Sequence, residues 1–272
     1  MISWAIAWTN AKIVGEYLHF YNLIFFRFLL GFITLIPFII IKKIPLPKAN
    51  HIKYIIIPSL LFFLYNIAFF KGTNFGLAGQ GGVLVTTLNP LFTMIIMTLI
   101  NKKILIKEIL GIFLGIFGGF IIMNLHKEGL NNIYNPNNIY FIICAITWGF
   151  MTVSIKYAQQ LINPYIFICL CYFFTMVICL PFTNITNINL NLLDLRFYLN
   201  FFLVSIGAMS FGTSIYIYST SILGPTRVSV FIFSVPFIAM LTANIVLNEP
   251  FTKNIVIGGL LSLLSIYIIN KK

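Results

Sequence analysis

Long, uninterrupted runs of apolar residues recur along this chain of 272 residues and limit what it can fold into. The stretch "LIFFRFLLGFITLIPFIII" at 23–41 is typical, because apolar and polar residues do not alternate in it as they do in the strands of a membrane β-barrel. Within lipid, such a segment satisfies its backbone hydrogen bonds only as a helix. The runs therefore predict an all-α membrane protein.

Composition excludes a water-soluble fold, because only 8% of the residues are charged, against about 25% in soluble domains. A membrane helix needs about 20 residues, so ten helices would use roughly 200 and leave about 70 for loops. We expect spans at 1–17, 20–41, 54–70, 77–100, 105–124, 139–158, 164–183, 197–219, 226–247 and 254–270.

The two halves of the chain resemble each other at matched positions. Trp4 precedes Lys12 by eight residues. The second half repeats this spacing with Trp148 and Lys156. The longest polar stretch leaves five expected spans on either side, and an odd number makes the second half enter the membrane from the opposite face. We therefore expect ten transmembrane helices as two inverted five-helix repeats, at 1–124 and 139–272, joined by a linker loop at 125–138.

Charges in the loops predict the orientation. The loops after the second and fourth spans are rich in lysine, and their counterparts in the second half are not. Because cytoplasmic loops carry the excess of Lys and Arg, we expect both termini on the cytoplasmic side of a bacterial-type inner membrane. The residues compared are Lys42, Lys43, Lys48 and Lys53 against Asp194 and Arg196, and Lys102, Lys103 and Lys107 against Glu249 and Lys253.

Several motifs, in this order and spacing, resemble the drug/metabolite transporter superfamily, EamA type. They are "FRFLLGFITLIP" (26–37), "LNPLFTMIIMTLI" (88–100), "ITWGFMTVSIK" (146–156) and "LGPTRVSVFIFSVPFIAMLTANIVLNEPFT" (223–252). The resemblance covers essentially the whole chain. It implies ten helices in two inverted repeats and transport of small metabolites, commonly amino acids or related compounds and often by export.

The chain departs from that family at two places. Only three residues precede Trp4, whereas about ten apolar residues precede Trp148, so the first helix is expected to be clipped by about two turns. The glutamate that is usual in the family after the fourth span is Lys103 here, while Glu249 keeps it after the ninth.

Prolines at matched positions predict a cavity. Pro90 and Pro236 are expected near the middle of their spans, where each frees the carbonyl one turn earlier, of Thr86 and of Ile232. Freed carbonyls persist in lipid only beside protein or a water-filled cavity. The two kinks therefore favour a cavity at the bilayer midplane, although proline also occurs in purely structural kinks.

Polar residues inside the spans are the candidate substrate contacts. Asn89 and Thr86 share a helix face, where an amide either binds substrate or joins helices. Arg27 is a bidentate carboxylate site if it faces inward, and a headgroup anchor if it snorkels outward. The remaining lining candidates, each of which has packing as its alternative, are Trp148, Tyr65, Asn66 and Tyr216.

Two lysines close their spans at opposite membrane faces. Lys12 and Lys156 are expected to contact either a gate or lipid headgroups, and the anchoring role is favoured. The net charge of +12 is spread over short loops, which predicts lipid rather than nucleic acid as the partner. Glycines at 111–119 and 258–259 predict close helix packing or a homodimer contact.

Enzyme motifs are missing from the sequence. It has no HExxH, no phosphate loop and no pair of aspartates within a span, so we expect no catalysis, cofactor or metal. The functional prediction is a secondary transporter that moves a small polar metabolite by alternating access. The alternative is a non-transporting membrane receptor or assembly protein.

Overall fold

The computed structural model describes residues 1–101, 106–223 and 234–270. The described residues are helices and connecting turns, and contain no strand. The helices are α1 (Ile2–Gly15), α2 (Phe20–Ile41), α3 (Lys53–Phe75), α4 (Ala78–Asn101), α5 (Ile106–Ile122), α6 (Leu125–Glu128), α7 (Pro136–Ala158), α8 (Pro164–Cys179), α9 (Leu195–Phe202), α10 (Ser214–Leu223), α12 (Val235–Leu247) and α13 (Lys253–Asn270).

One helix changes its winding along its length. A π-helical segment, Leu203–Thr213, continues α9 into α10. Single 3₁₀ turns occur in the connections, at Ala49–His51, Leu130–Tyr134, Leu180–Phe182, Ile185–Asn187 and Leu190–Leu192. Since π-helical turns are rare and occur frequently at functional sites, this long π segment is a candidate part of a site.

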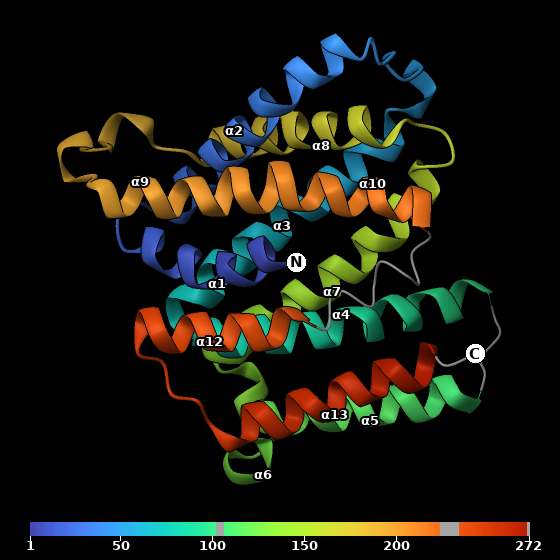
Figure 1. The fold of residues 1–272 in the computed structure, drawn as a ribbon, viewed down its shortest axis with the longest axis vertical. Coiled ribbons are helices and arrows are strands. Elements are labelled where there is room, and N and C mark those ends of the chain that lie inside the picture. The colour runs from blue at the N-terminus through green and yellow to red at the C-terminus, as the bar shows by residue number, and fades with distance from the viewer. Residues whose placement is uncertain (102–105, 224–233, 271–272) are drawn as a thin grey trace.

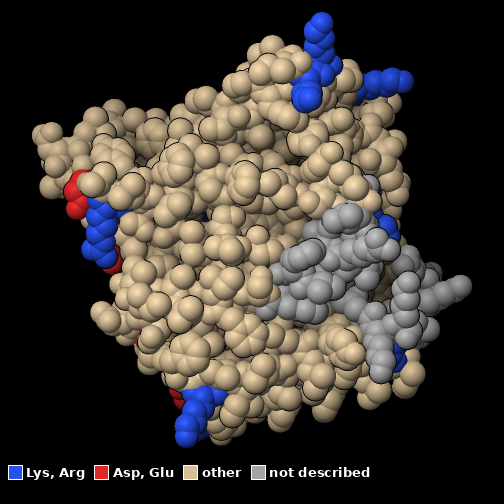
Figure 2. All heavy atoms as spheres, in the orientation of Figure 1, with Lys and Arg blue, Asp and Glu red and all other residues tan. Residues whose placement is uncertain are grey.

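Six stretches of the described chain are long and apolar enough to cross a membrane. The outer surface is apolar as well: on α5, the Phe113 side chain is 74% exposed and Leu110 is 58% exposed. Figure 2 shows a face with almost no Lys, Arg, Asp or Glu, and those that are visible lie at its margins. The all-helical membrane fold is confirmed. The six stretches are Phe20–Ile41, Ala49–Phe75, Ala78–Ile100, Pro136–Ala158, Pro164–Phe182 and Leu195–Ser219.

The predicted bounds agree closely for several spans and differ at others. The span expected at 20–41 is α2 itself. Helix α7 begins at Pro136, three residues earlier than expected, because the Asn135 side chain accepts from the Asn137 N–H and proline is favoured in a first turn. The start of the span expected at 226–247 lies outside the described residues.

Helices from the two halves of the chain interleave instead of forming separate bundles (Figure 1). Helix α2 packs on α8, α3 packs on α7 and α8, and α4 packs on α7 and α12. Helix α1 contacts α12 and the π segment. Residues that are far apart in sequence therefore surround a common interior.

The glycine-rich faces of α5 and α13 pack against each other within the chain. A Cβ atom at Gly118 would collide with Ser262 and with the Gly258 carbonyl, and one at Gly111 would collide with Ile269. The Ser265 hydroxyl donates to the Gly111 carbonyl across the same contact. This surface is occupied inside one chain, which leaves a homodimer through it as a prediction that the fold does not favour.

Candidate functional site

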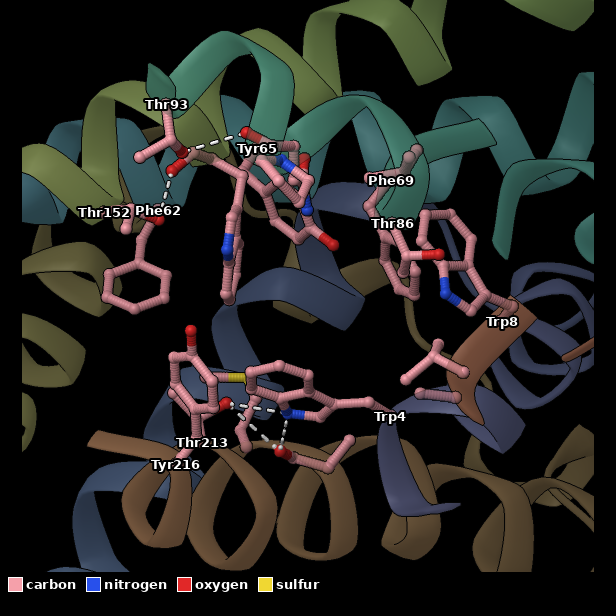
Figure 3. A pocket seen from close by; sticks show the side chains of 18 of the residues that line it. Trp4, Trp8, Phe62, Tyr65, Phe69, Thr86, Thr93, Thr152, Thr213 and Tyr216 are labelled. Atoms are coloured by element: carbon pink, nitrogen blue, oxygen red, sulfur yellow. Dashed lines mark hydrogen bonds between the residues drawn. The ribbon is translucent and has the colours of Figure 1, made fainter. Parts of the chain in front are cut away.

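A cavity of about 300 Å³ lies among the interleaved helices (Figure 3). This volume lies at the lower end of the range for small-molecule sites. Both halves of the chain line it: Trp4, Ala7, Trp8, Arg27, Phe62, Tyr65, Asn66, Phe69, Val85, Thr86, Asn89, Pro90, Thr93, Met94, Trp148, Thr152, Ala208, Met209, Thr213, Tyr216, Val235, Ile266 and Ile269.

Aromatic rings form much of the wall, including all three tryptophans of the chain. Trp148, near the middle of α7, lies edge-to-face on Trp4 with ring centroids 5.6 Å apart. Its ring centroid lies 5.0 Å from that of Tyr65, and Trp4 and Tyr216 are 4.8 Å apart. Figure 3 shows Trp4, Tyr65 and Tyr216 around the same space. Trp4 and Trp8 were not singled out as candidates from the sequence, because a short first helix gives no indication of which face is buried.

Arg27 of α2 faces inward and is only 5% exposed. Its Nε donates to the Val204 carbonyl (3.0 Å) and its Nη1 donates to Asn66 Oδ1 (2.6 Å). The guanidinium carbon lies 5.1 Å from the ring centroid of Phe69. The structure therefore places Arg27 beside the predicted candidate Asn66 at the cavity wall, facing the protein interior.

Asn89 and Thr86 both line the cavity on α4, which runs without interruption through Pro90. In the amide orientation that satisfies hydrogen bonding, Asn89 Nδ2 donates to the carbonyls of Val85 (3.0 Å) and Ala145 (3.3 Å). The second bond joins α4 to α7, which is the helix-joining role left open by the sequence. The Thr86 hydroxyl donates within its own helix, to the Gly82 carbonyl.

Side chains from other helices bond to the carbonyls of the π segment. The Trp4 Nε1–H donates to the Ala208 carbonyl (3.0 Å) and the Tyr172 hydroxyl donates to the Met209 carbonyl (3.0 Å), in addition to the Arg27 bond to Val204. The altered winding thus presents backbone acceptors to α1, α2 and α8. No pattern in the sequence predicted the π segment, because a π segment has the same apolar composition as an α-helix.

A cluster around Glu249 lies about one helical turn beyond the cavity-lining Trp8 of α1. We call it the Glu249 junction (Lys12, Gly76, Ala78, Gly79, Asn244 and Glu249). Glu249 is 7% exposed, and its Oε1 accepts from Lys12 Nζ at 2.8 Å. The same carboxylate accepts from the Ala78 N–H (2.8 Å) and the Gly79 N–H (2.9 Å) at the first turn of α4. An anion at a helix N-terminus is favourable, so the junction joins α1, α4 and the end of α12.

The junction is completed by two backbone contacts. Lys12 Nζ also donates to the Gly76 carbonyl (2.9 Å), and Asn244 Nδ2 donates to the Glu249 carbonyl (2.8 Å). Asn248 adopts φ 54°, a left-handed conformation that turns the chain at the end of α12. Of the gate and anchor roles left open for Lys12, these contacts favour the gate.

Lys156 lies in a different environment from Lys12. Phe141 of α7 packs against Gly76 of the Glu249 junction, and Lys156 follows it by fifteen residues, or about 22 Å along the helix. Lys156 is exposed, and it has no ion pair with a residue in the described part of the chain. Its surroundings suit an anchor more than a gate.

Pro236 is buried in the first turn of α12, a position that proline favours, and the mid-span kink expected there stays a prediction. The carbonyl of Ile232, which a mid-span kink would free, lies outside the described residues.

Tyr17, just after the end of α1, and Asp194, just before α9, form an exposed contact. The Tyr17 hydroxyl donates to Asp194 Oδ2 (3.0 Å), and the Phe197 N–H donates to Asp194 Oδ1 (2.8 Å). These two donors, the backbone N–H foremost, hold the pKa of the Asp194 carboxyl below its usual value of 3.8. Among the described residues, no group of His, Cys, Asp and Glu is arranged to bind a metal.

Comparison with known proteins assigns the family. The EamA-like transporter family matches residues 1–124 and 136–271. The chain belongs to this family. As an EamA-like protein with six membrane-crossing apolar stretches in its described part, it is an integral, multi-pass membrane protein.

Relatives of this EamA-like chain are distant. It is 26% identical to an uncharacterized transporter of Clostridium kluyveri over 85% of this chain and 77% of that protein. It is 26% identical to a protein of Rickettsia bellii named an S-adenosylmethionine uptake transporter, over 54% of this chain and 49% of that protein. The chain also resembles a crystal structure of another protein, with a TM-score of 0.65 at 16% identity. The match covers 98% of this chain and 97% of that chain, which shows a shared fold.

Proposed function

We propose that this protein is a secondary transporter that moves a small polar metabolite across the membrane by alternating access. The observation that carries the proposal is the cavity of about 300 Å³ between the two halves of the chain. A buried cationic side chain, Arg27, lines it, and the Glu249 junction lies about one helical turn beyond the lining residue Trp8. A receptor or assembly protein needs neither an interior cavity with a buried cation nor an ion pair that can separate.

The proposed topology is ten spans in two inverted five-helix repeats. Its support is the pattern of expected spans, the matched Trp–Lys spacings and the division of the family match into 1–124 and 136–271. The lysine-rich loops support cytoplasmic termini in a bacterial-type inner membrane. In this orientation the Glu249 junction faces the outside, and Lys156 lies toward the cytoplasm.

In the proposed cycle, the Glu249 junction is the outer closure. Opening outward requires the Lys12–Glu249 pair and its bonds to α4 to separate, while the aromatic wall and Arg27 hold the solute midway. Alternating access in such folds proceeds by rocking of one repeat against the other around a fixed site. The proposed solute contacts are Arg27, Asn66, Tyr65, Trp148 and Tyr216, with Thr86 and Asn89 on the α4 wall.

Uptake by purified protein in proteoliposomes tests the function. A metabolite mixture is offered with and without a pH gradient, and it includes S-adenosylmethionine because Rickettsia relatives are named for that solute. We expect the flux to fall about tenfold or more in Trp148→Ala, because this change removes a central ring of the cavity wall. We also expect the flux to fall in Asn89→Leu. The matched control is Phe113→Ala, because Phe113 is 74% exposed to the outer surface.

Two results contradict the proposal. Absence of flux for every solute offered would favour the receptor or assembly alternative. Unchanged flux in both Trp148→Ala and Asn89→Leu, with the proteins inserted, would remove the cavity from the transport path.

A further inference from the structure

The cavity contains a cation without a counter-ion. Arg27 is the one residue with a formal charge among the described residues that line the cavity. The ion pairs found in the described chain, Lys12–Glu249 and Arg196–Glu16, do not involve it. A buried cation that lacks an anionic partner is costly, so an occupant with an anionic group would relieve this cost.

The guanidinium is held in place and leaves one nitrogen unused. Nε bonds to Val204 and Nη1 bonds to Asn66, while Nη2 has no hydrogen-bond acceptor in the described part of the chain. Phe69 and Phe70 flank the guanidinium at 5.1 Å and 5.7 Å. Arginine fixed in this way recognises planar oxyanions, and a carboxylate is the smallest common one.

The rest of the wall suits a flat apolar body. The rings of Trp4, Trp148, Tyr65 and Tyr216 lie within 6 Å of one another in a connected series. The lining threonine hydroxyls donate to backbone carbonyls, as Thr93 does to Asn89 and Thr152 does to Trp148. The hydroxyls of Tyr65 and Tyr216 remain as neutral donors on the wall. Arg27 is therefore the one cationic donor that the described wall offers to an anion.

We propose that the substrate is a small carboxylate with an aromatic or similarly flat body, bound by Arg27 and the aromatic wall, and that the cavity selects against solutes of net positive charge. This inference rests on the proposed transport function, because it assigns the cavity as the solute site. It separates this chain from the relatives named for S-adenosylmethionine, a solute whose ammonium and sulfonium groups outweigh its single carboxylate.

Charge selection is tested by binding, which needs no flux. All three tryptophans line the cavity, so their fluorescence in detergent-purified protein reports occupancy. The probes are 3-phenylpropionate and phenethylamine, which share a ring and linker and differ in the charged end, together with S-adenosylmethionine. We expect 3-phenylpropionate to bind about tenfold or more tighter than either cationic probe, since the charged hydrogen bond is available to it alone.

Two variants assign the selectivity to Arg27. Arg27→Gln is expected to lower the affinity for 3-phenylpropionate about tenfold, whereas Arg196→Gln, on an exposed arginine, leaves it unchanged. Asn66→Asp is nearly isosteric and places a carboxylate against Nη1, so it remains informative if Arg27→Gln does not fold. We expect it to weaken binding of the acid and to strengthen binding of the amine.

Several outcomes would overturn the inference. They are equal or tighter binding of phenethylamine, tighter binding of S-adenosylmethionine, no response to 3-phenylpropionate, or an unchanged acid-to-amine ratio in Asn66→Asp. Binding of the acid without flux in proteoliposomes would count against transport alone, so the two proposals fail separately.

Discussion

Lys12 and Lys156 occupy matched places in the two halves of the chain, eight residues after a tryptophan, yet their surroundings differ. Lys12 is joined to a buried carboxylate, to a backbone carbonyl and through them to the first turn of α4. Lys156 is exposed and has no ion pair in the described chain. Matched spacing therefore does not ensure a matched role.

The difference traces to the partner supplied by the other half. The segments 89–103 and 235–249 align, with a proline at the second position and a methionine at the sixth of each. The segment 235–249 ends in Glu249, which contacts α1 and α4, whereas 89–103 ends in Lys103. Lys103 lies outside the described residues. Glu249 thus gives Lys12 an acidic partner, and the role of each lysine depends on the partner that the other half supplies.

Removing the Glu249 carboxylate should have the largest effect. Glu249→Gln leaves Lys12 without its counter-ion and weakens the acceptor for the α4 N-terminus, so we expect a loss of about 3 kcal/mol in unfolding free energy. Lys156→Met is the matched control and should change it by about 0.5 kcal/mol or less. Unfolding in detergent measures both. Equal losses would abolish the contrast between the two lysines.

Exchanging the charges should have an intermediate effect. Lys12→Glu combined with Glu249→Lys restores attraction between the two side chains but places a cation at the N-terminus of α4. We expect the double variant to remain about 1 kcal/mol less stable than the parent, because a helix N-terminus favours an anion. The same unfolding measurement decides this, and full recovery would show that the helix terminus contributes little.

Introducing an acid into the first half should have a smaller effect. Lys103→Glu gives 89–103 the same final residue type as 235–249. If the halves are symmetric, Lys156→Met should then cost about 0.5 kcal/mol more in the Lys103→Glu background than in the parent. A double-mutant cycle measures this coupling. A coupling of zero would confine the junction to one end of the protein.

Lowering the pH should have the smallest effect, and it should act through the exposed contact between Tyr17 and Asp194. Because the pKa of Asp194 is lowered in the fold, its contribution to stability is present above the unfolded pKa and is lost as pH falls through the folded value. We expect a slight loss of stability below about pH 4 that is absent in Asp194→Asn. A parent and variant with the same acid dependence would show that the Tyr17–Asp194 contact is immaterial.

Sequence reasoning located much of the cavity wall. Arg27, Asn66, Tyr65, Trp148 and Tyr216 were singled out because polar groups and tryptophans within apolar spans seek the protein interior, and all five line the cavity. It left open whether Arg27 faces the protein interior or snorkels to the headgroups, because the sequence of one helix does not show which of its faces packs against other helices. It also left Glu249 as a family feature without a role.

The sequence by itself determined the class of structure and the family, because lipid leaves an apolar segment no alternative to a helix and the motifs keep their order. Tertiary structure alone decided which helices meet, where the π segment presents its carbonyls, and that Lys12 pairs with a residue 237 positions away. Such contacts depend on how helices from both halves interleave, and the hydropathy of a single segment carries no information about that packing.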